Sequence, residues 1–510
     1  MSEHNRAIPA LLITALVALT GCASLAPALP QAQPGIPATW PLPESTAQTA
    51  VAQTARAADP APLPVADIGW RDFFADDRLA DVIALALEHN RDLRVAALNV
   101  ERVQAQYRIQ RSQRLPSIGA ELLLERTGGD APVTEGYQAG IGVAAVELDL
   151  FGRVRSLSQA ALERYLATDE ARRATQLSLV GQVAGTWLAL AADQELLRLS
   201  EAVMDAYSQT LELGLRRYEA GATSALELEQ IRTQVATAQA DVARQRGQVA
   251  QGRNALNLLV GLPVPERLLP DDRVETVTGL DGFSDADAAD GFAGLAAVPD
   301  GLDSRLLLRR PDVLAAEHLL RGANADIGAA RAAFFPSISL TGSAGSVSDE
   351  LSGLFDSGSR YWAFMPRLNI PIFQGGRLRA ALGMAQADRD IALAQYEQAI
   401  QAGFRDVADA LALGESLAAQ LQAREDLVGA AGRAEALARA RHDAGLDSYL
   451  LLLDVQRTLY AAQQALVATR MAEQANRVTL YRALGGGWRE DSARPLPPQD
   501  PAGPAGNDTD

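Results

Sequence analysis

The second half of this 510-residue chain repeats the first half, and this internal repeat constrains the fold more than any other feature. Leu115 to Ile118 matches Phe335 to Ile338. Arg217 to Ser224 matches Arg441 to Ser448, at a slightly larger spacing. Each match is weak alone, but all occur in the same order, and four inserted residues explain the change in spacing. The chain therefore consists of two copies of one structural unit.

Each copy is predicted to contain a helix, two strands and two long helices. Residues 76–114 and 303–334 carry apolar residues three and four positions apart, which is typical of helices. Both helices stop before a proline, which ends a helix and favours extended backbone before it. After Pro116, apolar side chains alternate with others, which indicates a strand. Partner strands are predicted at 137–147 and 360–370.

Four strands of about ten residues have the length that crosses an outer membrane at a tilt. Four strands cannot close a barrel, and an open edge is not tolerated in lipid because its backbone groups lack partners. Three copies of the chain would supply twelve strands, an even number within the bacterial range. The alternation alone also fits a soluble sheet of two hairpins, because barrel signals are weak in any single strand.

The helices that follow the strands are unusually long. No proline interrupts Arg153 to Tyr218 or Gly376 to Arg441. Helices of this length extend about 100 Å, too far for one compact domain. Each ends near a glycine, which tolerates the left-handed turn that closes a helix. Return helices are predicted at 224–260 and 448–484, so that two helical hairpins extend away from the strands.

The amino-terminal residues resemble the leader of a bacterial lipoprotein. Residues 1–21 contain Arg6 and an apolar run from Ala7 to Leu19, which is typical of a secretory signal. The run is followed by Cys22, the single cysteine, in a Leu-Thr-Gly-Cys sequence that looks like a lipobox. The resemblance implies that Cys22 becomes the acylated first residue, and that Ala23, which is not Asp, allows transfer to the outer membrane. A stray cysteine is the alternative.

Charge and residue types disfavour several function classes. The formal net charge of -17 disfavours a nucleic-acid partner, because phosphate binding needs clustered positive charge. The four histidines are scattered and form no pattern of metal ligands or of a general base, so that no catalytic residue, metal site or cofactor is predicted. The alternative from another class is a periplasmic coiled-coil scaffold lipoprotein without a pore.

The ordered motifs together resemble the TolC-like outer-membrane factors of tripartite efflux pumps, in the OprM-like lipoprotein branch that serves RND-type pumps. The resemblance covers residues 69–488. Its motifs are the lipobox at Cys22, the two Pro-Ser-Ile joints, Glu147 to Arg153, Pro371 to Arg377, the paired Ala-Gly turns, and Leu480 to Trp488. The resemblance implies a mixed α and β fold: a trimeric 12-stranded outer-membrane β-barrel, continuous with a long periplasmic α-helical barrel.

The resemblance also implies residue roles and partners. Leu450 and Asp454 would form the channel gate, although TolC itself has a second aspartate where this chain has Leu451. The turns with Gly221 and Ser224, and with Gly445 and Ser448, would contact the adaptor. The partners would be a periplasmic adaptor, an inner-membrane RND-type pump and outer-membrane lipid. The alternative for Asp454 is an ordinary solvated charge on a helix. Any helical hairpin can also have glycine at its turn.

The chain would then be organised in six segments. They are a signal peptide at 1–21, a lipidated amino terminus and tether at 22–68, a first repeat at 69–261, an equatorial segment at 262–302, a second repeat at 303–488 and a disordered tail at 489–510.

Overall fold

The computed structural model describes residues 25–40, 67–130, 132–270 and 304–492. The chain divides into two compact units. We name the first the strand unit, which comprises residues 1–34, 97–171 and 312–399, and the second the hairpin unit, which comprises residues 35–96, 172–311 and 400–510. Each unit is considered by itself. The predicted signal peptide, Cys22, most of the equatorial segment and residues 493–510 of the predicted tail lie outside the described residues, so the six-segment organisation stays a prediction.

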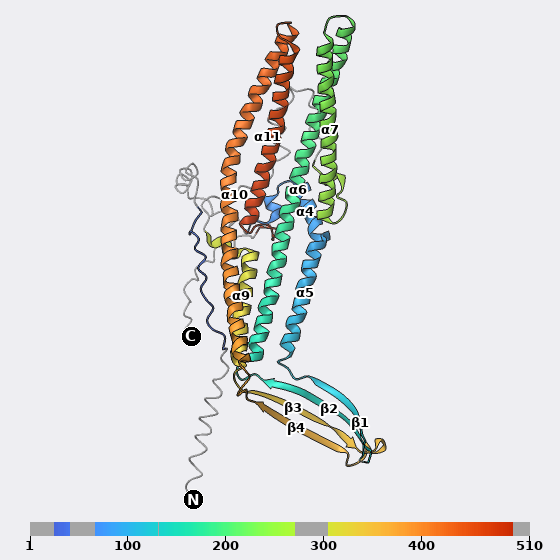
Figure 1. Cartoon of the computed structure of the whole chain (residues 1–510), viewed down its shortest axis with the longest axis vertical. Coiled ribbons are helices and arrows are strands. Elements are labelled where there is room, and N and C mark those ends of the chain that lie inside the picture. Colours follow the sequence, from blue (N-terminus) through green and yellow to red (C-terminus); the bar gives the residue numbers. More distant parts are fainter. Residues whose placement is uncertain (1–24, 41–66, 131, 271–303, 493–510) are drawn as a thin grey trace, which may run out of the picture. The chain divides into compact units, whose positions relative to one another are not determined.

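The strand unit contains one antiparallel sheet with the order β1-β2-β3-β4 (Figure 1). Its strands are β1 (Ile118–Thr127), β2 (Thr134–Leu148), β3 (Ser337–Ser348) and β4 (Arg360–Asn369). The two central strands, β2 and β3, come from different repeats, and their register shifts between Val143 and Val146. The four predicted strands are thus confirmed, and β1 and β4 are the edges of the sheet.

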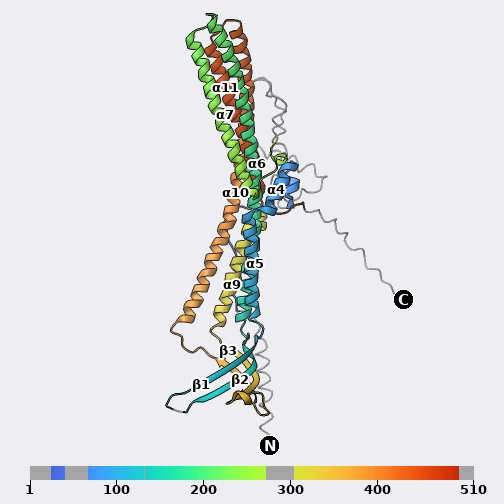
Figure 2. The same ribbon diagram turned by 90° about the vertical axis from the view of Figure 1, so that its right-hand side faces the viewer.

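Four helices lie next to these strands along the chain, two before and two after them. They are α5 (Arg91–Ser112), α6 (Arg153–Glu219), α9 (Pro311–Ala332) and α10 (Arg377–Asp443). Figure 2 shows α5, α9 and the first parts of α6 and α10 next to the sheet in the strand unit. The helices α6 and α9 are joined by an ion pair between Arg164 and Asp326. On the other side of α6, the rings of Tyr107 and Tyr165 stack, with centroids 6.4 Å apart.

A segment near the amino terminus is docked on α9. Asn324 Nδ2 donates to the carbonyl oxygen of Pro27 at 2.8 Å, and Arg331 donates to that of Leu25 at 3.0 Å. Between them Gly328 lies so close to Ala26 that a Cβ atom there would be 2.9 Å from its nitrogen. The described start of the predicted tether is therefore held along a helix by hydrogen bonds, which the Pro- and Ala-rich sequence did not indicate.

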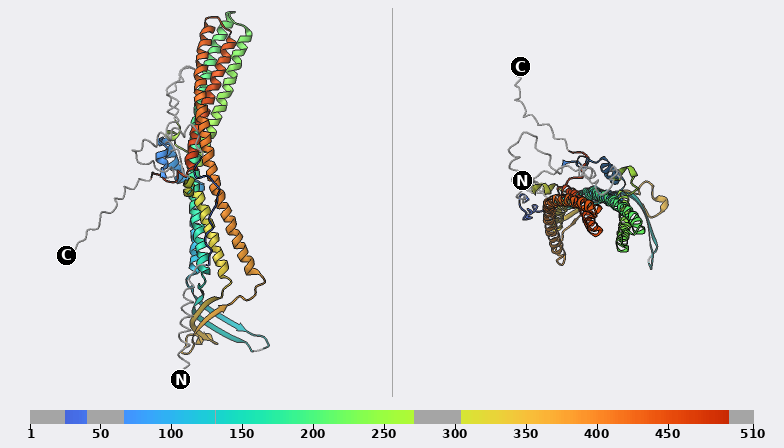
Figure 3. Two further views of the ribbon diagram at one scale, coloured as in Figure 1. Left: turned by 90° about the vertical axis from the view of Figure 1, so that its left-hand side faces the viewer. Right: turned by 90° about the horizontal axis from the view of Figure 1, so that it is seen from above.

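The hairpin unit consists mainly of two helical hairpins. The return helices α7 (Ala225–Val260) and α11 (Tyr449–Ala483) pack with the later parts of α6 and α10 (Figure 3). All four helices contribute to one apolar core, formed by Leu199, Val203, Tyr207, Ile231, Val235, Ala238, Ala438, Tyr449, Leu452 and Leu453. The repeat is visible in side-chain contacts too: Arg246 pairs with Glu201 at 2.7 Å, and the equivalent Arg470 pairs with Glu425 at 3.3 Å.

Two predicted helices are each divided in the structure. The predicted helix at 76–114 is split into α4 (Asp77–His89) and α5, with Asn90 between them. The Asn90 side chain accepts from the backbone N–H of Leu93 at 2.8 Å, so it caps α5 and ends the first helix. The helix predicted at 303–334 is split into the 3-10 helix η4 (Ser304–Arg309) and α9, which begins with Pro311 at a position where its missing N–H costs nothing.

Short elements complete the hairpin unit. The helix α3 (Trp70–Phe73) was not predicted, and its Phe73 ring stacks on Tyr481 with centroids 3.8 Å apart. The 3-10 helix η3 (Glu266–Leu268) packs near α6, where Trp187 Nε1 donates to the carbonyl oxygen of Leu268 at 3.1 Å.

The strand unit also has one short element, the 3-10 helix η5 (Leu351–Gly353), which lies in the loop between β3 and β4.

Candidate functional site

The two turns at the ends of the helical hairpins share one backbone structure. In the first, Ala222 N donates to Arg217 O at 2.8 Å and Gly221 N donates to Tyr218 O at 2.9 Å. The second turn has the same two bonds at the equivalent positions of its repeat, both at 2.9 Å. This is a Schellman motif, which needs a left-handed residue, and Gly221 and Gly445 have φ angles of 71° and 73°. The predicted glycine turns are therefore present.

A side-chain contact distinguishes the second turn from the first. Arg441 donates two hydrogen bonds to the carboxylate of Asp447, at 2.6 and 3.0 Å. These bonds hold the pKa of Asp447 below its usual value. In the first repeat Thr223 occupies the equivalent position, so this clamp is absent there. Sequence reasoning missed the clamp, although an Arg and an Asp on either side of a Gly turn could have suggested it.

The two predicted serines begin the return helices, but they differ. Ser224 accepts from the backbone N–H of Glu227 at 3.2 Å and so caps α7. Ser448 occupies the equivalent position before α11 and makes no capping hydrogen bond with its side chain. Both residues lie at the hairpin ends, as predicted, but only Ser224 has a visible structural role.

The predicted gate residues lie on the first turns of α11. Leu450 is 60% exposed and Asp454 is exposed, while Leu452 and Leu453 are buried in the apolar core. Leu450 and Asp454 are four positions apart, so they share one face of the helix. That face is turned away from the core of its own chain. The geometry leaves both side chains available to a pore or to another chain.

A cleft of about 240 Å³ separates the two hairpins just below the turns. It is lined by Thr223 and Glu227 from the first hairpin and by His442 and Asp443 from the second, among others. Tyr449 also lines the cleft, and burial raises the pKa of its hydroxyl, with Tyr207 and Glu227 adding to the effect. The structure thus brings the two predicted turns together around one polar cleft.

The sheet has one markedly apolar face. The pairing places Ile141 between Ala120 and Ala344, and Ala344 opposite Trp362. Further along, Ile338 lies opposite Leu368 on the same face. The exposed large side chains of this face are Ile118, Leu122, Leu124, Ile141, Trp362, Phe364 and Leu368. The opposite face carries mostly Gly, Ser, Thr, Gln and Glu, including a hydrogen bond from Gln138 to Tyr361 across β3.

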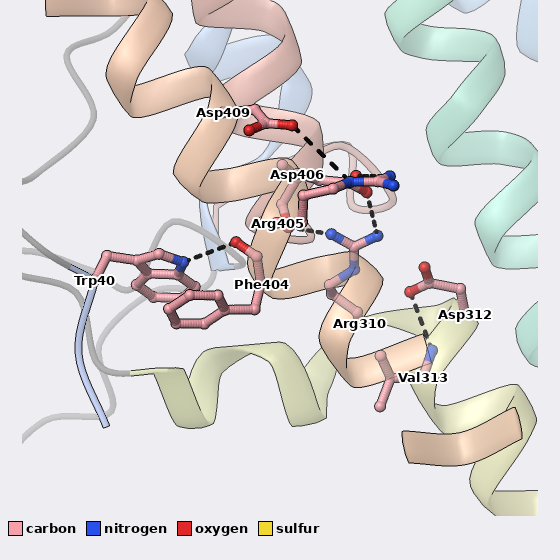
Figure 4. A network of polar contacts seen from close by, with 9 residues as sticks. Trp40, Arg310, Asp312, Val313, Phe404, Arg405, Asp406 and Asp409 are labelled. Atoms are coloured by element: carbon pink, nitrogen blue, oxygen red, sulfur yellow. Dashed lines mark hydrogen bonds and ion pairs between the residues drawn. The ribbon is translucent and has the colours of Figure 1, made fainter. Parts of the chain in front are cut away.

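In the hairpin unit, a cluster of polar contacts surrounds Arg310 (Figure 4). This buried side chain pairs with Asp406 at 3.5 Å and donates to the carbonyl oxygen of Ala483 at 2.7 Å. Close by, Trp40 stacks on Phe404 with ring centroids 5.3 Å apart and donates from Nε1 to its carbonyl oxygen at 3.0 Å. The later described part of the predicted tether is therefore also docked.

In the ranges 25–40, 67–130, 132–270 and 304–492, no helix is both long and apolar enough to cross a membrane. Within those same ranges no three His, Cys, Asp or Glu side chains are grouped so that they could hold a metal ion.

The sequence pattern of the family described as Outer membrane efflux protein matches residues 82–262 and 302–486. These two ranges include most of both repeats. The chain belongs to the outer membrane efflux protein family. This membership accounts for the repeat, the four strands and the paired helical hairpins, and it confirms the family predicted from the ordered motifs.

Known outer membrane proteins resemble more than nine tenths of the chain. The solvent efflux pump outer membrane protein SrpC of Pseudomonas putida is 44% identical over 93% of this chain and 97% of its own length. The probable outer membrane lipoprotein SilC of Salmonella typhimurium is 37% identical over 94% and 98%. The open-state crystal structure of the MtrE outer membrane channel of Neisseria gonorrhoeae has a TM-score of 0.79 and 35% identity, covering 92% of this chain and all of that one.

Proposed function

We propose that three copies of this chain form the outer-membrane exit channel of a tripartite efflux system. The observation that carries the proposal is the open four-stranded sheet, with one apolar face and two unpaired edges, on a chain that also has two long helical hairpins. Lipid can contact the apolar face, and further copies can pair with the edges, so that no backbone group is left unpaired in the membrane. The family and the name of MtrE as a channel support this role.

The partners are a periplasmic adaptor, an inner-membrane RND-type pump and outer-membrane lipid. The adaptor contacts are assigned to the turns with Gly221, Ser224, Gly445 and Ser448, since both turns lie at the hairpin ends and border one polar cleft. Acylation of Cys22 anchors the chain in the outer membrane, and the naming of SilC as a lipoprotein supports it. The cargo is a class of toxic small molecules, in line with the solvent efflux named for SrpC.

The gate is assigned to Leu450 and Asp454. Both are exposed on one helical face at the hairpin ends, where no side chain of the apolar core covers them. Three copies of Asp454 around an axis would repel one another and attract cations, while Leu450 would narrow the pore. A scaffold without a pore would use the helical hairpins, but it would give no role to the exposed apolar face of the sheet.

The test is to extract the protein in detergent, measure its mass and then record currents in a planar bilayer. A trimer mass together with stepwise, cation-preferring conductance is expected. A monomer or dimer that is released without detergent and conducts no current would overturn the proposal and favour the scaffold.

A further inference from the structure

We infer that neighbouring copies of the chain contact each other through α5 of one copy and α10 of the next, in the register in which α9 contacts α6 within one chain. The inference rests on the proposed trimer and adds the residues that join its subunits. Its basis is the repeat: α5 is equivalent to α9, and α10 is equivalent to α6. The partner is therefore a second copy of this chain.

The contact within one chain is close and well defined. His318 Nδ1 lies 2.7 Å from Glu163 Oε2, and both side chains are largely buried. One turn further along α9, a Cβ atom on Gly322 would lie 3.4 Å from the Cβ of Glu163 and 4.0 Å from the Cγ of Arg164. Gly322 thus lies at a place where the two helices approach closely.

Each of these positions has an equivalent in the other repeat, and the equivalents predict which residues meet between chains. When the repeats are aligned, both ends of α5 coincide with those of α9, and both ends of α6 coincide with those of α10. Gly322 is therefore equivalent to Arg102, and Glu163 and Arg164 are equivalent to Ala387 and Asp388. Arg102 of one copy should then lie against Ala387 and Asp388 of the next.

The exposed apolar residues support this pairing. On α5, Leu98 and Ile109 are each more than half exposed, and on α10 the same is true of Met384 and Ile391. Helix α5 has no buried residue. The equivalents of Ile109, Met384 and Ile391 are alanines, and all three are buried in the single chain. They are Ala329, Ala160 and Ala167. Three buried alanine positions of α9 and α6 thus have large, apolar and exposed equivalents on α5 and α10.

The charges are complementary as well. Arg102 and Asp388 are both exposed and form no ion pair with the described part of their own chain. Within the chain, Arg164, the equivalent of Asp388, pairs with Asp326 on α9, one turn beyond Gly322. Between chains the acidic group would come from α10 and the basic group from α5. Within the chain the basic group is on α6, the equivalent of α10, and the acidic group is on α9, so the two charges are exchanged between the equivalent helices. This reversal favours contact between copies over a wrong pairing of helices.

The sheet edges agree with this arrangement. Within one chain β2 of the first repeat pairs with β3 of the second. Their equivalents are β4 and β1, which are at opposite edges of the sheet. These two strands can meet only between different copies, in the same order as α10 and α5.

Disulfide formation between paired cysteines tests the register. Arg102→Cys with Ala387→Cys should give covalently linked dimers and trimers on mild oxidation, because a disulfide needs Cβ atoms about 4 Å apart. The matched control is Gly322→Cys with Glu163→Cys, which should close within one chain and leave its mass unchanged. Arg102→Cys with Ala394→Cys, about two helical turns out of register, should not link chains.

Charge reversal provides a second test that does not depend on cysteine. Arg102→Asp should at least halve the fraction of trimer in detergent, and adding Asp388→Arg should restore it. If the wild-type protein is a trimeric channel but the matched cysteines do not link chains, or Asp388→Arg gives no rescue, the register is overturned and the channel stands. If the wild-type protein is not a trimer, both the register and the proposed function fail.

Discussion

Asn90 and Arg310 occupy equivalent positions in the two repeats, and each donates a hydrogen bond to the last turn of a return helix. Asn90 Nδ2 donates to the carbonyl oxygen of Leu259, and Arg310 donates to that of Ala483, both at 2.7 Å. The two carbonyls are themselves at equivalent positions of the repeat. Each repeat therefore fastens the start of its α5 or α9 helix to the end of its hairpin, with an amide in one case and a guanidinium in the other.

This equivalence predicts unequal costs for the two truncations. Arg310→Ala should destabilise the protein by about 2–3 kcal/mol, because it removes a charge-assisted bond and leaves Asp406 without this partner. Asn90→Ala should cost about 1–2 kcal/mol, since it removes a neutral bond and the cap of α5. Thermal unfolding followed by circular dichroism in detergent measures both. An equal or larger loss for Asn90→Ala would contradict the assignment.

Gly221→Pro and Gly445→Pro should abolish export and leave the trimer intact. Proline cannot adopt the positive φ of either turn, and it lacks the N–H that closes the Schellman motif. Gly432→Ala, in the interior of α10, is the matched control; nothing lies within 4 Å of its Cβ position, so it should be neutral or slightly stabilising. Drug resistance and trimer mass are the measurements. Normal resistance in both proline variants would count against the turns as adaptor contacts.

Asp454→Ala should make the closed channel leakier and less selective for cations. Three carboxylates near an axis raise the local cation concentration over about 10 Å at moderate salt, and alanine removes that field. Leu450→Ala combined with Asp454→Ala should open the pore more than either change alone. Conductance and reversal potential in a planar bilayer under a salt gradient separate the two effects. An unchanged reversal potential in Asp454→Ala would show that Asp454 does not face the pore.

Tyr449→Phe should stabilise the hairpin ends by about 1–2 kcal/mol. The Tyr449 hydroxyl is buried and has no hydrogen-bond partner among the residues described, so its removal relieves an unmet desolvation cost. Because burial raises the pKa of Tyr449, the unfolded chain releases this proton above about pH 10, the ordinary tyrosine pKa, while the folded protein still holds it. The free energy of unfolding therefore falls as the pH rises above about 10. The wild type should therefore lose more thermal stability above pH 10 than Tyr449→Phe. Equal losses would place the titrating group elsewhere.

Cys22→Ser should remove the acyl chains without necessarily preventing membrane insertion, which the strands drive. Mass spectrometry of the mature amino terminus checks this, and an unmodified Cys22 in the wild type would exclude the lipoprotein assignment. The docking of residues 25–27 on Asn324 and Arg331 should persist in the variant, since none of those bonds involves Cys22. Protection of the α9 backbone from hydrogen exchange would report on it.

Much of the fold could be predicted because its signals are local. Prolines 116 and 336 end helices and start strands, and alternation along a strand needs no distant residue. Gly221 and Gly445 close helices through their own φ angles. The division at Asn90 was missed because the apolar spacing continues through it, and only the side-chain cap on Leu93 shows where one helix ends.

The sequence by itself determined the repeat, the order of helices and strands, the family, and the positions of the turns and of the exposed Leu450 and Asp454. Only the tertiary structure decided which strands are edges, that residues 25–40 are docked, and that Arg441 clamps Asp447. The physical reason is the distance along the chain between the residues that interact. Turn and helix signals depend on neighbouring residues, whereas sheet order, docking and side-chain pairing depend on groups that folding brings together.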